Sequence, residues 1–298
     1  MTELAQSVDV YNYLLEGPRN SALWDRYYLL YLEDISAVFD GFTALNIADL
    51  GICHNELRVV VGPNGAGKST MCDVVSGLTR PTTGQVYFNG QVITQLDVAD
   101  IASRGVRRKF QTPNVFDSLS VWENMLLALP ALREDDTAIA RRIEAYEPRL
   151  SGPAGVAAYR LWHRMRNLGG RVTPERQDRI TQLLERVGLL AERRTLARQL
   201  SHGQRQWLAI AGLILSAPKL LLVDEPAAGL TDHETALTAQ LLNELKGEHT
   251  LIVIEHDMEF VRLLDSRVTV LNEGKVLADG SLSTIQSDAR VIEAYLGR

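Results

Sequence analysis

A glycine-rich stretch that ends in a lysine and a serine is the part of the sequence best suited to binding phosphate. Residues 62–69 read GPNGAGKS and fit the pattern G-x-x-x-x-G-K-[ST]. In such a loop the backbone N–H groups turn inward around phosphate oxygens, and the following helix adds its partial positive charge. Lys68 would reach the outer phosphates, and the Ser69 hydroxyl could ligate Mg²⁺. The candidate phosphate-binding residues are Gly62, Pro63, Asn64, Gly65, Ala66, Gly67, Lys68, Ser69 and Thr70.

Two adjacent carboxylates could supply the other half of a phosphate-cleaving site. Asp224 and Glu225 follow the apolar residues 220–223, which predict a strand. Sheets of the α/β class bind ligands outside the carboxyl ends of their strands, so both acids are well placed. Asp224 would hold the water shell of Mg²⁺, while Glu225 would polarise the attacking water. Two acids after a strand are also a common loop ending, and it is the phosphate loop that favours the catalytic interpretation.

Short apolar runs predict the strands that must carry these residues. Residues 57–61 (LRVVV) predict a buried strand directly before the phosphate loop, and a helix should run from the loop towards Gly77. Short β segments are expected from residue 31 onwards, with a first strand at residues 31–39 and a hairpin bracketed by Gly84 and Gly90. Later strands, separated by helical stretches, are expected at residues 220–223, 251–254 and 268–271. This alternation predicts an α/β fold with a parallel sheet.

A basic helical block interrupts this α/β pattern. Residues 121–198 show the apolar spacing of helices, with breaks expected at Pro148, Pro153 and Pro174. Residues 101–200 hold 18 Lys and Arg against 11 Asp and Glu, whereas the chain as a whole has a net charge of −6. Such a block could dock near a partner or near anionic lipid headgroups, or its arginines could simply cover solvated helix faces.

Composition limits the class of protein. The chain has 298 residues, 46% of them hydrophobic, which suits one large globular domain or one with a subdomain. The longest apolar run, residues 208–215, is far shorter than the ~20 residues that cross a bilayer, and the first residues show no secretory signal. Two cysteines, Cys53 and Cys72, favour a reducing cytoplasm, and the acidic net charge argues against nonspecific nucleic-acid binding. A leader at residues 1–28 has no assigned role.

Residues 200–206 (LSHGQRQ) resemble the LSGGQ signature of the ATP-binding-cassette family. The resemblance covers the chain from about residue 31 to its end. It implies a P-loop cassette domain over residues 29–298, with a RecA-like core, an antiparallel β subdomain and an inserted helical subdomain at about residues 113–200. It also implies an ATPase that binds ATP and Mg²⁺.

The same resemblance assigns roles to further residues. The family's signature contacts the γ-phosphate of ATP held by the opposite subunit, and its residues here are Ser201, His202, Gly203 and Gln204, with His202 in place of the usual glycine. Gln111 occupies the place of a glutamine that touches Mg²⁺ and water, and His256 that of a histidine that orients the water. The expected metal ligands are Ser69, Gln111 and Asp224. The expected catalytic residues are Glu225, His256 and Gln111.

Some assignments leave alternatives open. Phe39 is expected to stack on adenine, with Phe42 as competitor and a buried core role as the alternative for either. Either Thr231 or Asp232 could make the cross-subunit contact of the loop after the two acids. Ser201 should also cap a helix at residues 204–216.

Longer stretches resemble the ATPases of importers for branched-chain amino acids and urea, and the urea type is the closer match. Residues 39–42, 108–113 and 200–204 carry the likeness to the urea type. The resemblance implies a cytoplasmic subunit, peripheral on the inner face of the membrane, that pairs with a second cassette subunit. Its other partners would be transmembrane permeases and, indirectly, a solute-binding protein. Urea is the expected solute, and a branched-chain amino acid importer or a soluble cassette ATPase without a transport role are the alternatives.

Overall fold

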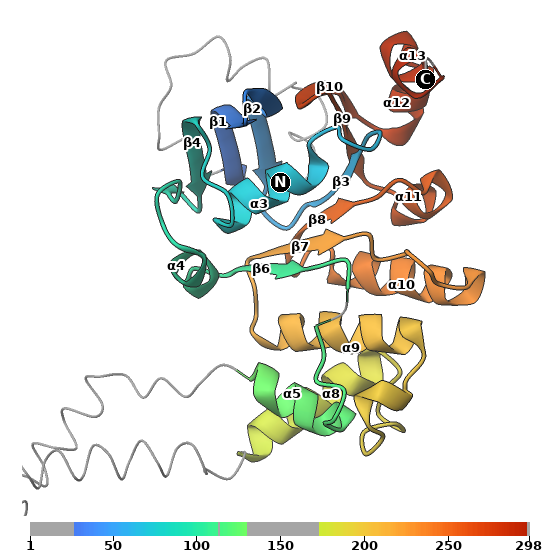
Figure 1. The fold of residues 1–298 in the computed structure, drawn as a ribbon. Helices are drawn as coiled ribbons and strands as arrows, with labels where there is room; N and C mark the ends of the chain where they lie inside the picture. The colour runs from blue at the N-terminus through green and yellow to red at the C-terminus, as the bar shows by residue number, and fades with distance from the viewer. Residues whose placement is uncertain (1–26, 113, 130–172, 297–298) are drawn as a thin grey trace, which may run out of the picture. The chain divides into compact units, whose positions relative to one another are not determined.

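The computed structural model describes residues 27–112, 114–129 and 173–296. The chain forms two compact units, one made of residues up to Asn114 and from Pro218 onwards, the other running from Val115 to Ala217. The first unit is α/β and the second is helical (Figure 1). The leader predicted at residues 1–28 lies outside the described residues except for its last two, and Pro148 and Pro153 lie outside them as well.

A four-stranded antiparallel sheet opens the α/β unit, with the strand order β2-β1-β4-β5. The prediction of short β segments is wrong for β1 (Tyr28–Phe39) and β2 (Phe42–Cys53), which have 12 residues each. They pair antiparallel, with register shifts after Tyr28 and after Ala37, and Asp40 and Gly41, with φ of 49° and 83°, form the tight turn between them. The first strand therefore begins at Tyr28 rather than at residue 31.

The hairpin predicted around residues 84–90 is present, but only Gly90 of the two bracketing glycines lies in its turn. Strands β4 (Thr83–Phe88) and β5 (Gln91–Val92) pair antiparallel around Asn89 and Gly90. Gly84 instead lies inside β4, where a Cβ atom would come within 2.4 Å of the carbonyl oxygen of Asp34. A glycine in a strand can thus mark a close backbone approach as well as a turn.

A six-stranded sheet forms the core of the α/β unit, with the order β10-β9-β3-β8-β7-β6. Its predicted strands are confirmed as β3 (Leu57–Val61), β7 (Leu220–Asp224), β8 (Thr250–Ile254) and β9 (Arg267–Asn272). Sequence patterns missed the edge strands β6 (Val106–Lys109) and β10 (Lys275–Gly280). The sheet is parallel except for β10, which runs antiparallel to β9.

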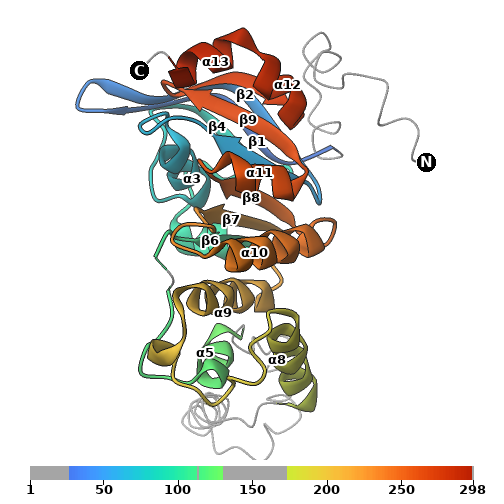
Figure 2. The ribbon, with the colours of Figure 1, turned by 90° about the vertical axis from the view of Figure 1, so that its right-hand side faces the viewer.

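Helix α3 (Lys68–Ser76) lies between the two sheets (Figure 1). Its buried residues Met71 and Val75 share one apolar core with residues of both sheets, such as Leu45 and Leu222. Helices α10 (Asp232–Leu245) and α11 (Met258–Leu264) lie side by side in the same unit (Figure 2). The remaining helices of this unit are α4 (Val98–Ser103), α12 (Leu282–Ser287) and α13 (Ala289–Leu296). The layered core thereby fixes the start of α3 against the ends of the parallel strands.

The helical unit contains α5 (Val121–Ala128), α8 (Pro174–Arg186) and α9 (His202–Leu215), which pack on one another. A short 3₁₀ helix, η2 (Ala197–Gln199), precedes α9. The break predicted at Pro174 is confirmed, because Thr173 is extended and this proline is the first residue of α8. Proline is favoured there, since the first helical N–H has no partner within the helix.

Candidate active site

The phosphate loop joins the buried strand β3 to α3, as its sequence predicts. Gly67 caps the helix in a left-handed conformation with φ of 97°, and a Cβ atom there would come within 2.6 Å of the carbonyl oxygen of Ala44. Only glycine therefore fits this position. At Gly65, by contrast, a Cβ would meet nothing within 4 Å, so the loop is open at this point.

Lys68 is buried at the start of α3 and folds back over the loop. Its Nζ donates hydrogen bonds to the carbonyl oxygens of Gly62 at 2.7 Å and Pro63 at 3.0 Å. Burial lowers the pKa of Lys68, and the charges of Glu225 and Asp224 oppose that shift. The negative charges of both acids therefore favour the charged form of this lysine.

The structure brings the three predicted catalytic side chains together at the ends of β7 and β8. The amide Nε2 of Gln111 donates to Oε2 of Glu225 at 2.6 Å, and Nδ1 of His256 lies 3.6 Å from Oε1 of the same carboxylate. Glu225 has a left-handed φ of 44°, which is uncommon for a residue with a Cβ. This turn carries the Glu225 side chain between the other two.

Asp224 directly precedes Glu225 and is mostly buried. Nη2 of Arg108 lies 3.4 Å from its Oδ2, and Arg108 also pairs with Asp73 of α3. Burial raises the pKa of Asp224, while the charge of Arg108 and its hydrogen bond oppose this effect. Arg108 therefore links the helix of the phosphate loop to the predicted metal ligand.

The sequence pattern indicated no role for Glu255, which contacts both the loop after Glu225 and the residue His256. Its side chain is 1% exposed and accepts hydrogen bonds from the N–H of Ala227 at 3.0 Å and of His256 at 3.2 Å. Burial raises the pKa of Glu255, and these backbone hydrogen bonds oppose the shift. The signal was an acid directly after an apolar strand and before a histidine. The sequence pattern also gave no sign of Lys109, a buried cation at the end of β6.

The predicted metal ligands fit Mg²⁺ in chemistry. Ser69, Gln111 and Asp224 offer hydroxyl, amide and carboxylate oxygens, the hard donors that this ion prefers. The described residues hold no group of three or more His, Cys, Asp or Glu that could bind a metal alone. That composition suits Mg²⁺ bound together with substrate phosphates, because such sites use only one or two carboxylates.

Phe39 and Phe42 both lie at the surface, so the alternative of a buried core role is wrong. The two rings belong to residues paired across the turn between β1 and β2, and they are 46% and 67% exposed. Both remain free to stack on a planar ligand, and the choice of Phe39 stays a prediction.

Comparison with known proteins decides the family. A sequence model described as ABC transporter matches residues 45–228. This chain belongs to the ABC transporter family. It is accordingly an ATP-binding subunit and an ATPase that uses ATP and Mg²⁺. A second model, described as branched-chain amino acid ATP-binding cassette transporter, matches residues 275–298.

Individual relatives cover nearly the whole cassette. The chain is 33% identical to the high-affinity branched-chain amino acid transport ATP-binding protein LivG of Escherichia coli (strain K12), over 90% of this chain and 98% of LivG. It resembles the solved ADP conformation of an ATP-binding cassette of an ABC transporter, with 27% identity, a TM-score of 0.70 and coverage of 91% and 99%. Another cassette, solved as a dimer with ADP and Pi, gives 25% identity, a TM-score of 0.64 and coverage of 85% and 98%.

The signature of this cassette starts α9, and the predicted capping role of Ser201 is confirmed. Its Oγ accepts from the N–H of Gln204 at 3.1 Å, and Oε1 of Gln204 accepts from the N–H of Ser201 at 3.0 Å. The helix begins at His202, two residues earlier than predicted, because this reciprocal pair fixes its first turn. His202 and Ser201 are exposed, whereas Gly203 is buried.

The loop after the two acids ends in a second capping pair. Thr231 caps α10, and its Oγ1 accepts from the N–H of Glu234 at 3.3 Å. Asp232 lies in the first turn of this helix and is exposed. The threonine hydroxyl already has an intramolecular role, so Asp232 is the more available of the two for a contact with another chain.

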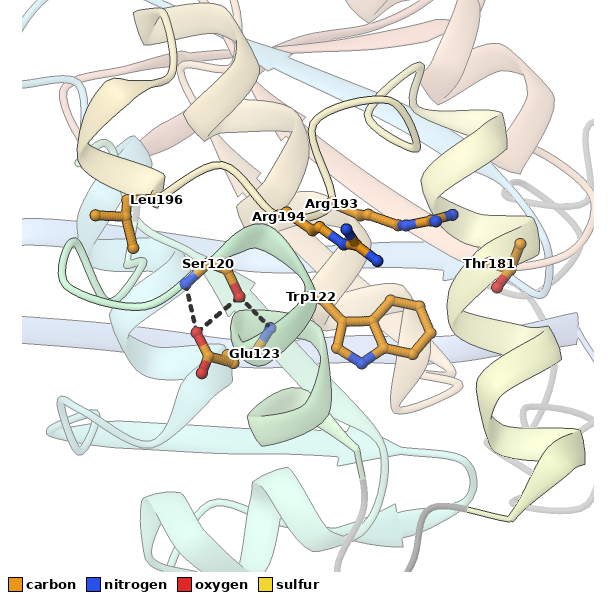
Figure 3. A pocket seen from close by; sticks show the side chains of 7 residues that line it. All are labelled: Ser120, Trp122, Glu123, Thr181, Arg193, Arg194 and Leu196. Atoms are coloured by element: carbon orange, nitrogen blue, oxygen red, sulfur yellow. Dashed lines mark hydrogen bonds between the residues drawn. The ribbon is translucent and has the colours of Figure 1, made fainter.

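The helical unit of the cassette contains a pocket of about 620 Å³ (Figure 3). Trp122 of α5, Thr181 of α8 and the residues Arg193, Arg194 and Leu196 line it. The other lining residues, Ser120 and Glu123, form the capping box of α5. Among the described residues, neither Arg193 nor Arg194 forms a side-chain hydrogen bond or ion pair.

No helix within the described ranges is both long and apolar enough to span a bilayer.

Proposed function

We propose that the chain is the ATP-hydrolysing subunit of an importer of branched-chain amino acids. This conclusion is carried by the likeness to LivG over 90% of the chain, and the match of residues 275–298 to the branched-chain model supports it. Urea, the solute expected from the sequence, is not supported by these relatives, whose names favour the alternative. The likeness of residues 39–42, 108–113 and 200–204 to the urea type keeps urea as the competing outcome of the test.

Two such cassettes would close on two ATP molecules, with the signature of each facing the phosphate loop of the other. The solved dimeric relative supports this arrangement, as does the exposure of Ser201 and His202 at the start of α9. The N-terminus of α9 would add positive potential towards the phosphates. The cross-subunit residues of this arrangement are Ser201, His202, Gly203 and Gln204.

Glu225 would act as the general base that readies water for attack on the γ-phosphate. Its contacts with Gln111 and His256 hold the carboxylate from two sides. Lys68 and the amides of the phosphate loop would neutralise the triphosphate, and Ser69, Gln111 and Asp224 would hold the metal, which supplies charge stabilisation to the phosphoryl oxygens. Phe39 would stack on the adenine.

The permease subunits would contact the stretch from Gln111 to Met125, which places the cassette peripherally on the inner face of the membrane. The pocket beside α5 supports this proposal, because Trp122 offers an apolar wall and the exposed Arg193 and Arg194 offer positive charge. A permease loop that carries acidic side chains and can pack against a tryptophan fits such a surface.

Uptake measurements test the proposed solute. A strain lacking this gene would be complemented with the wild-type chain or with Glu225→Gln, and uptake of labelled leucine and labelled urea would be followed. The expected result is that leucine uptake returns only with the wild-type chain. Restoration of urea uptake alone would instead establish the urea alternative, and restoration of neither would contradict an importer of either class.

A further inference from the structure

Strand β6 carries three basic residues in a row, and the last two are buried at the edge of the active site. The strand pairs parallel with β7, so that Arg108 lies opposite Leu222 and Lys109 opposite Val223. Arg108 reaches the carboxylates of Asp73 and Asp224. Lys109 is 2% exposed, yet it points at main-chain atoms rather than at a carboxylate.

The Lys109 ammonium donates to two carbonyl oxygens. One belongs to Phe110, at 3.2 Å, and the other to Asp224, at 3.3 Å. Phe110 directly precedes Gln111, while the Asp224 carbonyl belongs to the peptide unit that leads into Glu225. Lys109 thus connects the start of the loop that carries Gln111 to the peptide bond between Asp224 and Glu225.

Both ends of that peptide unit are held. Its N–H, which belongs to Glu225, donates to the carbonyl oxygen of Ile254 at 3.0 Å, and its carbonyl accepts from Lys109. The following residue, Glu225, has a left-handed φ of 44°. A residue with a Cβ stays in this conformation only when its surroundings fix it, because the conformation is costly.

A lysine at this place is expensive to bury. Lys109 is 2% exposed, so its ammonium has lost most of its contact with water, which disfavours the charged form. An apolar residue would fill an edge-strand position without that cost. Packing alone therefore gives no reason for an ammonium at residue 109.

We propose that Lys109 is a positioning residue for ATP hydrolysis. By holding the Phe110 and Asp224 carbonyls together, it fixes the turn at Glu225 and the reach of Gln111, so that the amide of Gln111 meets the catalytic carboxylate. The proposal rests on the ATPase chemistry of the family and is independent of the imported solute.

Lys109→Met removes the ammonium and keeps a long, unbranched side chain. We expect kcat for basal ATP hydrolysis by the full chain to fall at least tenfold, while the affinity for ATP changes less than threefold. In the nucleotide-free protein, the amide hydrogen of Glu225 should exchange at least tenfold faster. Lys109→Gln, which keeps an N–H donor, should retain more of kcat than the methionine variant.

Arg107→Met is the matched control, because Arg107 is also a basic residue of this strand and donates to the carbonyl oxygens of Ala102 and Val106. It should leave kcat and the exchange of Glu225 unchanged. The pair Lys109→Met and Gln111→Ala gives a second readout. If Lys109 acts through Gln111, the double variant should be no slower than Gln111→Ala alone.

Several results would overturn the proposal. A kcat of Lys109→Met within twofold of wild type would show that the ammonium positions nothing. Multiplication of the two single effects in the double variant would show that Lys109 and Gln111 act independently. A methionine variant that melts far below wild type and loses ATP binding together with kcat would assign Lys109 to stability alone.

Discussion

Gln111 donates a hydrogen bond to Glu225 over 2.6 Å, although 114 positions separate the two residues in the sequence. Gln111 follows the edge strand β6, whereas Glu225 follows the neighbouring strand β7. The orientation of the Glu225 carboxylate therefore depends on the loop that carries Gln111. Any displacement of this loop would move the proposed general base, and this contact is the route by which we expect a partner to affect hydrolysis.

Glu225→Gln should abolish turnover without preventing ATP binding. The substitution removes the base but keeps the size of the side chain, and loss of a general base lowers rates by roughly 10²–10⁴-fold. Phosphate release would measure turnover, and light scattering would measure ATP-dependent pairing of cassettes, which should persist. Glu293→Gln, at an exposed position of α13, is the control and should hydrolyse ATP normally. Loss of ATP binding in Glu225→Gln would contradict the assigned role.

Gly67→Ala should both destabilise the chain and weaken ATP binding at least tenfold. The added Cβ would come within 2.6 Å of the Ala44 carbonyl oxygen, so the loop must shift. Gly188→Ala is the matched control, because Gly188 also has a positive φ, of 68°, but its Cβ would meet nothing within 4 Å. The control measures only the free-energy cost of placing a residue with a Cβ atom in a left-handed conformation, which is about 1–2 kcal/mol. Thermal unfolding and ATP titration would compare the two, and equal ATP affinities would contradict the steric argument.

How far the site could be predicted depended on whether its determinants are local. The phosphate loop, Asp224 with Glu225, and the cap Ser201 follow from neighbouring residues, and the structure places them as their patterns indicate. Strand β6 was missed because its sequence VRRK looks solvent-exposed.

The partners that make β6 a strand are distant in sequence. Arg108 and Lys109 meet Asp73 and the main chain of Asp224, and no local pattern encodes these contacts. The turn between β1 and β2 likewise needs a positive φ at Asp40, a residue type that adopts it less readily than glycine. Contacts between residues far apart in the sequence therefore determine these strands, and local residue spacing does not reveal them.

Asp279→Asn should destabilise the chain by about 3 kcal/mol, because it removes a partner of a buried cation. Arg58 is 2% exposed, and its guanidinium lies 3.0 Å from Asp279 and 2.6 Å from Glu56. Asp279 lies within the C-terminal stretch matched by the branched-chain model, so this stretch stabilises the strand before the phosphate loop. Unfolding in urea would measure the loss.

Asp288→Asn is the control for that experiment. Asp288 pairs at 2.7 Å with Arg290, whose side chain is exposed, and solvent screens such a pair. Its unfolding midpoint should match that of wild type. Equal midpoints for Asp279→Asn and wild type would show that Glu56 alone compensates Arg58.

Neither cysteine should be alkylated rapidly in the folded protein at pH 8. Burial raises the pKa of Cys72 to about 12, and desolvation together with Glu56 raises that of Cys53 to about 11 although its side chain is exposed. The thiolate is the reactive form, so a raised pKa at Cys53 lowers its rate about a hundredfold at this pH relative to a free cysteine. Iodoacetamide labelling followed by mass spectrometry would measure both rates. Rapid labelling of folded Cys53, at the rate seen in denaturant, would contradict this assignment.

Arg193→Glu should separate permease docking from ATP chemistry. Arg193 is exposed at the pocket beside Trp122, and charge reversal there should repel an acidic permease loop. Copurified permease should fall about tenfold, whereas basal ATP hydrolysis by the isolated subunit should stay within twofold. Arg179→Glu, on the exposed face of α8 outside the pocket, makes the same charge change and should leave copurification intact. Equal losses from both variants would trace the effect to net charge rather than to the pocket.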